Sequence, residues 1–196
     1  LVRWLLDHGV DPHEDEDAAV SPLLEAEEHE AIAAVLLSRG VKEPTLLKAI
    51  DARAPKTVAR LLASKKVDPN TKRDDGEPAL HAAIGAGDGA KRTAIVKALL
   101  DAGAKAEILD GGAAGLVTET ALDAAIHKAE DGSEGAVDVV KLLAAKTPID
   151  RDAMMIAAGM RSTQRDAVMD ALLGGRITPD VAYRGVGVTR DPKLVA

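Results

Sequence analysis

The chain has 196 residues, of which 46% are hydrophobic and 29% charged, and its formal net charge is −7. The length fits one folded unit, and the composition is that of a globular protein rather than of a disordered chain. The basic residues are scattered or paired rather than gathered into a stripe, which excludes a nucleic-acid partner, and the lack of cysteine excludes disulfides, thiolate metal sites and cysteine nucleophiles.

The interior must be built mostly from Ala, Leu and Val, because Trp4 and Tyr183 are the only aromatic residues. Apolar runs are short, so we expect no membrane span, and the lack of cysteine fits an intracellular protein, cytoplasmic or nuclear. The chain opens with LVRWLL, in the middle of an amphipathic pattern and without Met. We therefore expect it to be part of a longer protein.

Pairs of short helices recur along the chain. A helix that runs into a turn is predicted over 2–12, and each later unit has a first helix that begins at Ser, Thr or Pro, or close to one of them. These residues cap a helix or fit its first turn, and apolar residues three and four apart indicate one buried face. First helices are predicted at 21–26, 44–50, 78–84, 120–126 and 153–159. Second helices are predicted at 33–41, 58–70, 95–107 and 139–150.

Polar connectors with Asp-Pro and Asp-Gly turns join these units. Their lengths predict three protruding hairpins, which we call fingers, and no finger of comparable length at two further connectors. The fingers are expected at about 11–20, 68–77 and 105–119, and the short connectors lie at 41–43 and 146–151. A glycine-rich insertion at 85–93 is expected to lengthen the link between two helices of one unit.

The segment DDGEPALHAAI at 74–84, followed by IVKALLDAGAKAE at 95–107, resembles the ankyrin repeat. Pro78-Ala79 stands where that family usually has Thr-Pro, and His81 occupies the family's His position. The resemblance covers residues 1 to about 175. It implies an all-α fold, an ankyrin-type α-solenoid of stacked helix-turn-helix repeats with short β-hairpin fingers.

This resemblance also implies a division of the chain. Residues 1–184 form an ankyrin-repeat domain and residues 185–196 an extended C-terminal tail. Within the domain we expect a partial repeat at 1–12, repeats at about 13–41, 42–70, 71–107, 108–149 and 150–176, and a half repeat at 177–184.

Three patterns invite a chemical interpretation, and each has a structural alternative that we favour. The acidic run at 13–17 lacks the frame of a calcium loop and is interpreted as a solvated finger tip. The glycine-rich segment at 85–91 follows a helix, whereas phosphate-binding loops follow a strand. His81 resembles the family's structural histidine, and His127 is expected to end its helix. We therefore predict no catalytic residue, no metal site and no cofactor.

Protein binding is the function that the resemblance implies, because stacked repeats create an extended concave surface. The chain is predicted to be a monomeric scaffold without catalysis that binds another protein through its fingers and first helices. A second hypothesis is a regulatory or targeting module of a larger multidomain enzyme or channel. A third is a helical hydrolase or nucleotide-binding enzyme, since a fold alone does not exclude chemistry.

The candidate partner-binding residues lie on two neighbouring fingers. One finger carries acidic residues, and the next carries apolar residues in what should be an exposed loop. The complementary partner is a basic, partly apolar surface. The alternative is that the apolar loop folds back on its own repeat. The candidate residues are Asp74, Asp75, Glu77, Leu109, Leu116 and Val117.

Overall fold

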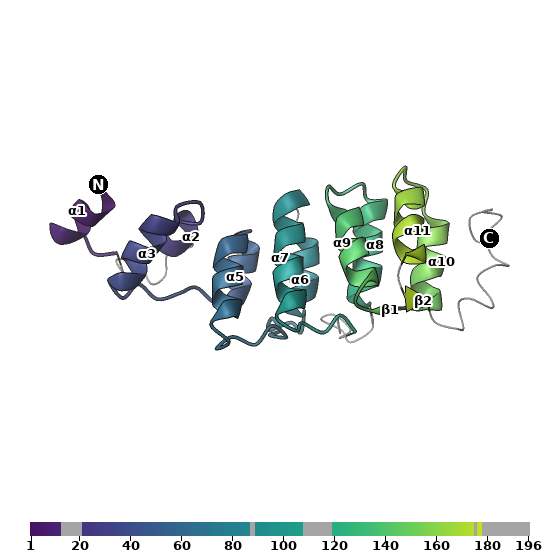
Figure 1. The fold of residues 1–196 in the computed structure, drawn as a ribbon, viewed down its shortest axis with the longest axis horizontal. Coiled ribbons are helices and arrows are strands. Elements are labelled where there is room, and N and C mark those ends of the chain that lie inside the picture. Colours follow the sequence, from purple (N-terminus) through teal and green to yellow (C-terminus); the bar gives the residue numbers. More distant parts are fainter. Residues whose placement is uncertain (13–20, 87–88, 108–118, 175, 178–196) are drawn as a thin grey trace.

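A computed structural model of the chain describes residues 1–12, 21–86, 89–107, 119–174 and 176–177. Short helices follow one another along a single elongated array (Figure 1). They are α1 (Val2–Asp7), α2 (Pro22–Glu25), α3 (Glu30–Ser38), α4 (Leu46–Asp51), α5 (Pro55–Ala63), α6 (Ala79–Gly85), α7 (Gly89–Asp101), α8 (Ala121–Glu130), α9 (Ala136–Ala144), α10 (Arg151–Gly159) and α11 (Arg165–Leu173). Two short strands, β1 (Pro148–Ile149) and β2 (Arg176–Ile177), complete the described elements.

The helices from α4 onward form two layers. In one layer α4, α6, α8 and α10 pack side by side, and in the other α5, α7, α9 and α11 do so. Each first helix also packs against the second helix that follows it, as α4 does against α5. The prediction of a solenoid built from stacked helix pairs is therefore confirmed.

Local sequence explains where several helices begin. Thr45 accepts a hydrogen bond from the backbone N–H of Lys48 at the start of α4, and Asp150 accepts one from Ala153 at the start of α10. Such caps satisfy backbone donors that the first helical turn leaves unpaired. The second helix α5 instead begins with Pro55, which has no N–H to leave unpaired.

One apolar core runs from α4 to α11. Leu99 and Leu100, which the sequence places on the buried face of their helix, are 0% and 7% exposed. A second, smaller cluster is formed by residues of α2 and α3 and of the turns that follow each of them. Its members are Leu23, Ala26, Ala33, Leu36 and Val41. The N-terminal unit therefore has an apolar centre of its own, and Figure 1 shows α3 tilted against the row of α5 to α11.

The strands β1 and β2 are a feature that the sequence analysis did not predict. They pair in parallel, with Pro148 opposite Arg176 and Ile149 opposite Ile177. The connector at 146–151 forms no hairpin of its own. Because equivalent connectors of neighbouring units lie side by side, their unpaired backbone groups meet and form this short ladder.

The expectation for the glycine-rich insertion at 85–93 is wrong. The link between α6 and α7 is residues 86–88, as short as residues 52–54 between α4 and α5. The inserted residues instead lengthen α7, which has 13 residues where α5 and α9 have nine. Among the described residues, no helix is long and apolar enough to cross a membrane.

Candidate functional site

The finger at 68–77 is a tight hairpin, as predicted. Lys72 and Pro78 form an antiparallel bridge, and the N–H of Arg73 donates to the carbonyl of Glu77 over 2.9 Å. Gly76 closes the turn with φ +93°, a conformation that favours glycine. The fingers expected at 11–20 and 105–119 lie mostly outside the described residues.

One arginine neutralises part of the acidic finger. The Arg73 guanidinium pairs with Asp51 of α4, and its Nε lies 2.7 Å from Oε2 of Glu77. These two carboxylates raise the pKa of Arg73, chiefly through the hydrogen bond to Asp51. Of the three acidic candidates, Glu77 is thus in an ion pair and only partly exposed, while Asp74 and Asp75 are exposed.

Asp75 also has a local role. Its Oδ1 accepts a hydrogen bond from the N–H of Glu77 over 3.0 Å, which fixes the turn that presents Asp74. The finger is tied to the next connector as well, because Oδ1 of Asn70 accepts from the N–H of Lys105 over 2.9 Å. The acidic tip is therefore held in place on both sides. The apolar candidates Leu109, Leu116 and Val117 lie outside the described residues.

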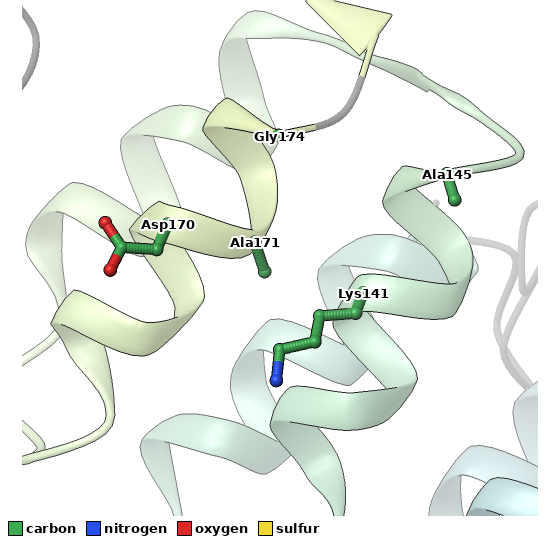
Figure 2. Close-up of a pocket in the computed structure, with 5 residues that line it drawn as sticks. All are labelled: Lys141, Ala145, Asp170, Ala171 and Gly174. Carbon is green, nitrogen blue, oxygen red and sulfur yellow. The ribbon is translucent and has the colours of Figure 1, made fainter.

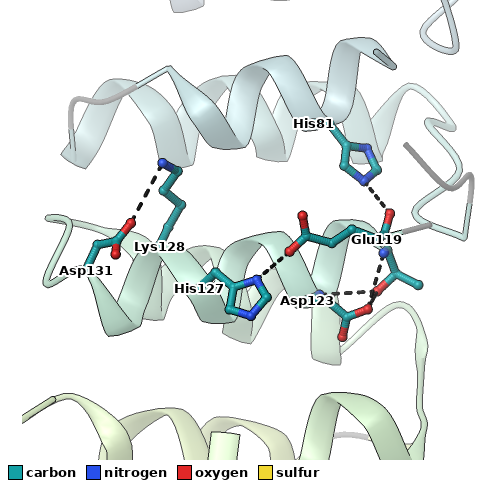
Figure 3. Close-up of polar contacts among 7 residues, drawn as sticks. His81, Glu119, Asp123, His127, Lys128 and Asp131 are labelled. Atoms are coloured by element: carbon teal, nitrogen blue, oxygen red, sulfur yellow. Dashed lines mark hydrogen bonds and ion pairs between the residues drawn. The ribbon is translucent and has the colours of Figure 1, made fainter. Parts of the chain in front are cut away.

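The base of the next finger joins two repeats (Figure 3). His81 of α6 is only 5% exposed, and its Nε2 donates to the carbonyl of Glu119 over 3.0 Å. The structural role predicted for His81 is thereby confirmed. The Glu119 carboxylate turns the other way, and its Oε1 lies 2.5 Å from Nδ1 of His127.

His127 lies in the last turn of α8, near the helix end where the sequence predicts it, and the helix itself continues to Glu130. Nδ1 of the imidazole is paired with Oε1 of Glu119. The exposed face of α8 thus carries two side-chain pairs, since Lys128 and Asp131 also lie 3.9 Å apart at its far end (Figure 3).

A capping box begins α8. The backbone N–H of Thr120 donates to Oδ2 of Asp123 over 3.2 Å, and the Thr120 hydroxyl oxygen accepts from the N–H of Asp123 over 3.2 Å. Asp123 is only 8% exposed, and burial is the main cause that raises its pKa, with Asp150 and Glu119 acting in the same direction. Its Oδ1 is buried without a hydrogen-bond partner.

Sequence reasoning missed the pairs that stiffen this surface. Arg73 and Asp51 are 22 residues apart, and Glu119 and His127 are eight apart. Neither spacing belongs to the helical pattern of three or four residues that indicates a pair on one helix. The sequence offered only a weak signal: each pair joins a finger residue to an acidic residue or a histidine in the last turn of a first helix.

Gly89 of the glycine-rich segment is packed against the next repeat. A Cβ atom placed on Gly89 would lie 2.6 Å from Cγ and 3.1 Å from Oε1 of Glu134, so this side chain lies at the start of α7. Arg92, which is 3% exposed, donates to the backbone carbonyl of Glu134 over 2.9 Å. These contacts favour the structural interpretation of the segment over a phosphate-binding loop.

No group of His, Asp or Glu side chains within the described ranges is arranged to hold a metal ion. A shallow hollow of about 340 Å³ lies between α9 and α11, in the layer of second helices (Figure 2). Small residues line much of it, and Lys141 and Asp170 are the charged residues that border it. This hollow is separate from the fingers and the first helices.

Comparison with protein families identifies the repeats. The family model for ankyrin repeats, in three copies, matches residues 46–154, which is more than half of the chain. The chain belongs to the ankyrin-repeat family. A search of curated proteins finds no match. The matched ankyrin repeats span α4 to the first part of α10, so both the hairpin finger and the side-chain pairs of α8 lie within them.

Ankyrin repeats are generally modules for protein–protein interaction, and ankyrin-repeat domains are typically non-catalytic. The departures of this array from the family pattern are local. Pro78 replaces the usual threonine beside His81, and Asp123 stands at the histidine position of the next repeat. A buried polar atom without a hydrogen-bond partner lies near each of these positions, Nδ1 of His81 and Oδ1 of Asp123.

Proposed function

We propose that this chain is a protein-interaction scaffold whose partner binds the surface formed by the fingers and first helices. The single observation that carries the proposal is the match of three ankyrin repeats, since such repeats mediate protein binding. In this proposal the chain binds without catalysing a reaction and acts as a monomer.

The partner-binding surface is proposed to centre on the fingers at 68–77 and 105–119. The exposed, turn-held carboxylates of Asp74 and Asp75 support the first half of this surface. A hairpin whose tip is fixed before binding loses little conformational entropy when a partner arrives. Leu109, Leu116 and Val117 are proposed to supply apolar contacts from the neighbouring finger.

A partner with a basic, partly apolar surface fits these residues. Asp74 and Asp75 would steer a cationic surface toward the finger, and the apolar side chains would slow its release. Glu77 contributes less direct charge, because Arg73 already pairs with it and with Asp51.

Affinity capture from an extract of the source cells tests this site. The baits are the wild-type chain, Asp74→Lys/Asp75→Lys and Leu109→Asp/Val117→Asp, each shown to be helical by circular dichroism. The matched control, Asp138→Lys/Asp166→Lys, makes the same charge change on the exposed sides of α9 and α11. Partners should be lost from the two finger variants and kept by the control, whereas identical partner lists for all baits would refute the site.

A further inference from the structure

The junction between the N-terminal unit and the rest of the array differs from the other junctions. The main core begins at Leu46, and the separate cluster of α2 and α3 ends at Val41. Leu24 of α2 packs against the main core, but it is only partly buried. Little apolar surface therefore joins the two units, and polar contacts gain importance at this boundary.

The first turn of α5 lacks a cap of its own. Its N-cap residue is Ala54, whose methyl group cannot accept a hydrogen bond, and Pro55 has no N–H. The backbone N–H groups of Lys56 and Thr57 therefore need acceptors from elsewhere.

Glu27, which lies between α2 and α3, supplies both acceptors. Its Oε1 accepts from the N–H of Lys56 over 2.5 Å, and its Oε2 accepts from the N–H of Thr57 over 3.0 Å. The Thr57 hydroxyl also donates to Oε2 over 2.6 Å, and Thr57 is completely buried. One carboxylate thus caps a helix of the next unit, where the helix dipole also favours a negative charge.

The neighbouring ion pair at this junction is weaker because both of its side chains are exposed. Glu28 pairs with Lys56 over 2.7 Å, but both side chains are more than half exposed. Exposed ion pairs of this kind contribute little to stability. Glu27 differs because its partners are backbone groups and a buried hydroxyl, which lose their hydrogen bonds entirely if the carboxylate leaves.

We propose that residues 21–41 open as a unit separately from residues 46–174, and that Glu27 is the latch that holds the two together. Opening uncaps α5 and uncovers Thr57, while the continuous core of α4 to α11 stays intact. The array thus has a built-in opening point at its N-terminal side, and this does not depend on which partner the fingers bind.

Hydrogen–deuterium exchange of the full chain, followed by mass spectrometry of peptides, tests the latch. In the wild type, amides of α3 should exchange faster than amides of α7. Glu27→Gln keeps the size of the side chain but removes its charge and one acceptor oxygen, so exchange in α3 should accelerate by roughly tenfold or more. Exchange in the α7 segment 95–100 should not change.

Glu28→Gln is the matched control, because it removes the neighbouring carboxylate and only an exposed ion pair. Thr57→Val, which deletes the hydroxyl and keeps the backbone donors, should accelerate α3 in the same pattern but by less than Glu27→Gln. The proposal is overturned if α3 and α7 accelerate together, since the chain would then open as one unit. It is also overturned if α3 is unaffected, or if Glu28→Gln acts as strongly as Glu27→Gln.

Discussion

At the scale of single residues, the start of α6 combines a proline at the usual threonine position with a buried histidine nitrogen that has no partner. Nε2 of His81 donates to Glu119, so in the neutral ring Nδ1 can only accept, and it is buried without a donor. Pro78, the N-cap of α6, has φ −67° and ψ 147°, close to Thr45 and Thr120 at the starts of α4 and α8. A threonine therefore fits this backbone and would bring a hydroxyl to the position where it is missing.

Pro78→Thr is expected to stabilise the fold. The new hydroxyl can cap α6 and donate to Nδ1 of His81. The substitution also adds a backbone N–H at position 78, which a valine at this position adds equally. The gain from capping is partly offset by the greater freedom of the unfolded chain. Pro78→Val is the control, because it matches threonine in shape without the hydroxyl. The unfolding free energy of Pro78→Thr, measured in urea, should exceed that of Pro78→Val by about 1 kcal/mol. Equal urea midpoints for the two variants would refute the proposed role of the hydroxyl.

Asp123 should make stability depend on pH in an unusual direction. Burial raises its pKa in the folded state above the unfolded value of about 3.9. Its protonation therefore supports folding fully below that value, and the support is lost as pH rises through the folded pKa. Asparagine is never charged, so the unfolding free energy of Asp123→Asn should increase relative to that of the wild type as pH rises from about 3 to 7.

Asp101 provides a control of opposite sign. Hydrogen bonds from Lys146 and then Lys97 lower its pKa to about 2. The ionised Asp101 stabilises the fold at pH values above its unfolded pKa, and this stabilisation is lost as pH falls toward about 2. The unfolding free energy of Asp101→Asn should therefore decrease relative to that of the wild type as pH rises over this acid range. Parallel pH curves for Asp123→Asn and Asp101→Asn would contradict the assignment.

At the scale of elements, glycine allows two helices of neighbouring repeats to begin side by side. A Cβ atom on Gly135, the N-cap of α9, would lie 2.6 Å from the carbonyl oxygen of Gly89 at the start of α7. Arg92 bridges the same junction through its bond to the Glu134 carbonyl. The junction between these repeats thus depends on backbone groups in direct contact, which leaves no room for a side chain at position 135.

Gly135→Ala should be more destabilising than Gly132→Ala. Both glycines have φ +73°, so the backbone strain of an alanine is equal, but nothing lies within 4 Å of a Cβ atom on Gly132. The strain common to both is about 1 kcal/mol, and the clash with Gly89 adds at least a further 1 kcal/mol or so. Thermal and urea unfolding of the pair measure the difference, and equal costs would show that the junction relaxes freely.

At the scale of the whole molecule, stability is distributed along the array. Each repeat from α4 onward packs against its neighbours in both layers, and the core passes through all of them without interruption. Such arrays lose stability stepwise when end repeats are removed, because each repeat contacts only its neighbours.

A chain that ends after Thr147 is expected to stay folded. It lacks α10 and α11, and it uncovers part of the faces of α8 and α9 that they pack against. The urea midpoint of unfolding should fall. The slope of the unfolding free energy against urea concentration should also decrease, because less surface is exposed on unfolding. Circular dichroism at low urea distinguishes this result from complete loss of helix, which would mean that the array folds only as a single unit.

Much of the fold could be predicted because its signals are local. Leu99 and Leu100 stand in a helical pattern that places them on one buried face, and the hairpin at 68–77 follows from its Asp-Asp-Gly turn. His81 could be assigned a structural role from its place in a repeat. These features depend on residues within one or two turns of chain, where spacing alone decides which side chains share a face.

Contacts between repeats were decided only by the tertiary structure. Glu27 meets Thr57 across 30 residues, Arg73 meets Asp51 across 22, and β1 meets β2 because their connectors are stacked. The sequence determined that helix pairs would stack, since each pair has an apolar face it cannot bury alone. It did not determine which polar groups would meet, because small shifts in the angle and spacing of the repeats select the partners of each exposed side chain and of each uncapped helix end.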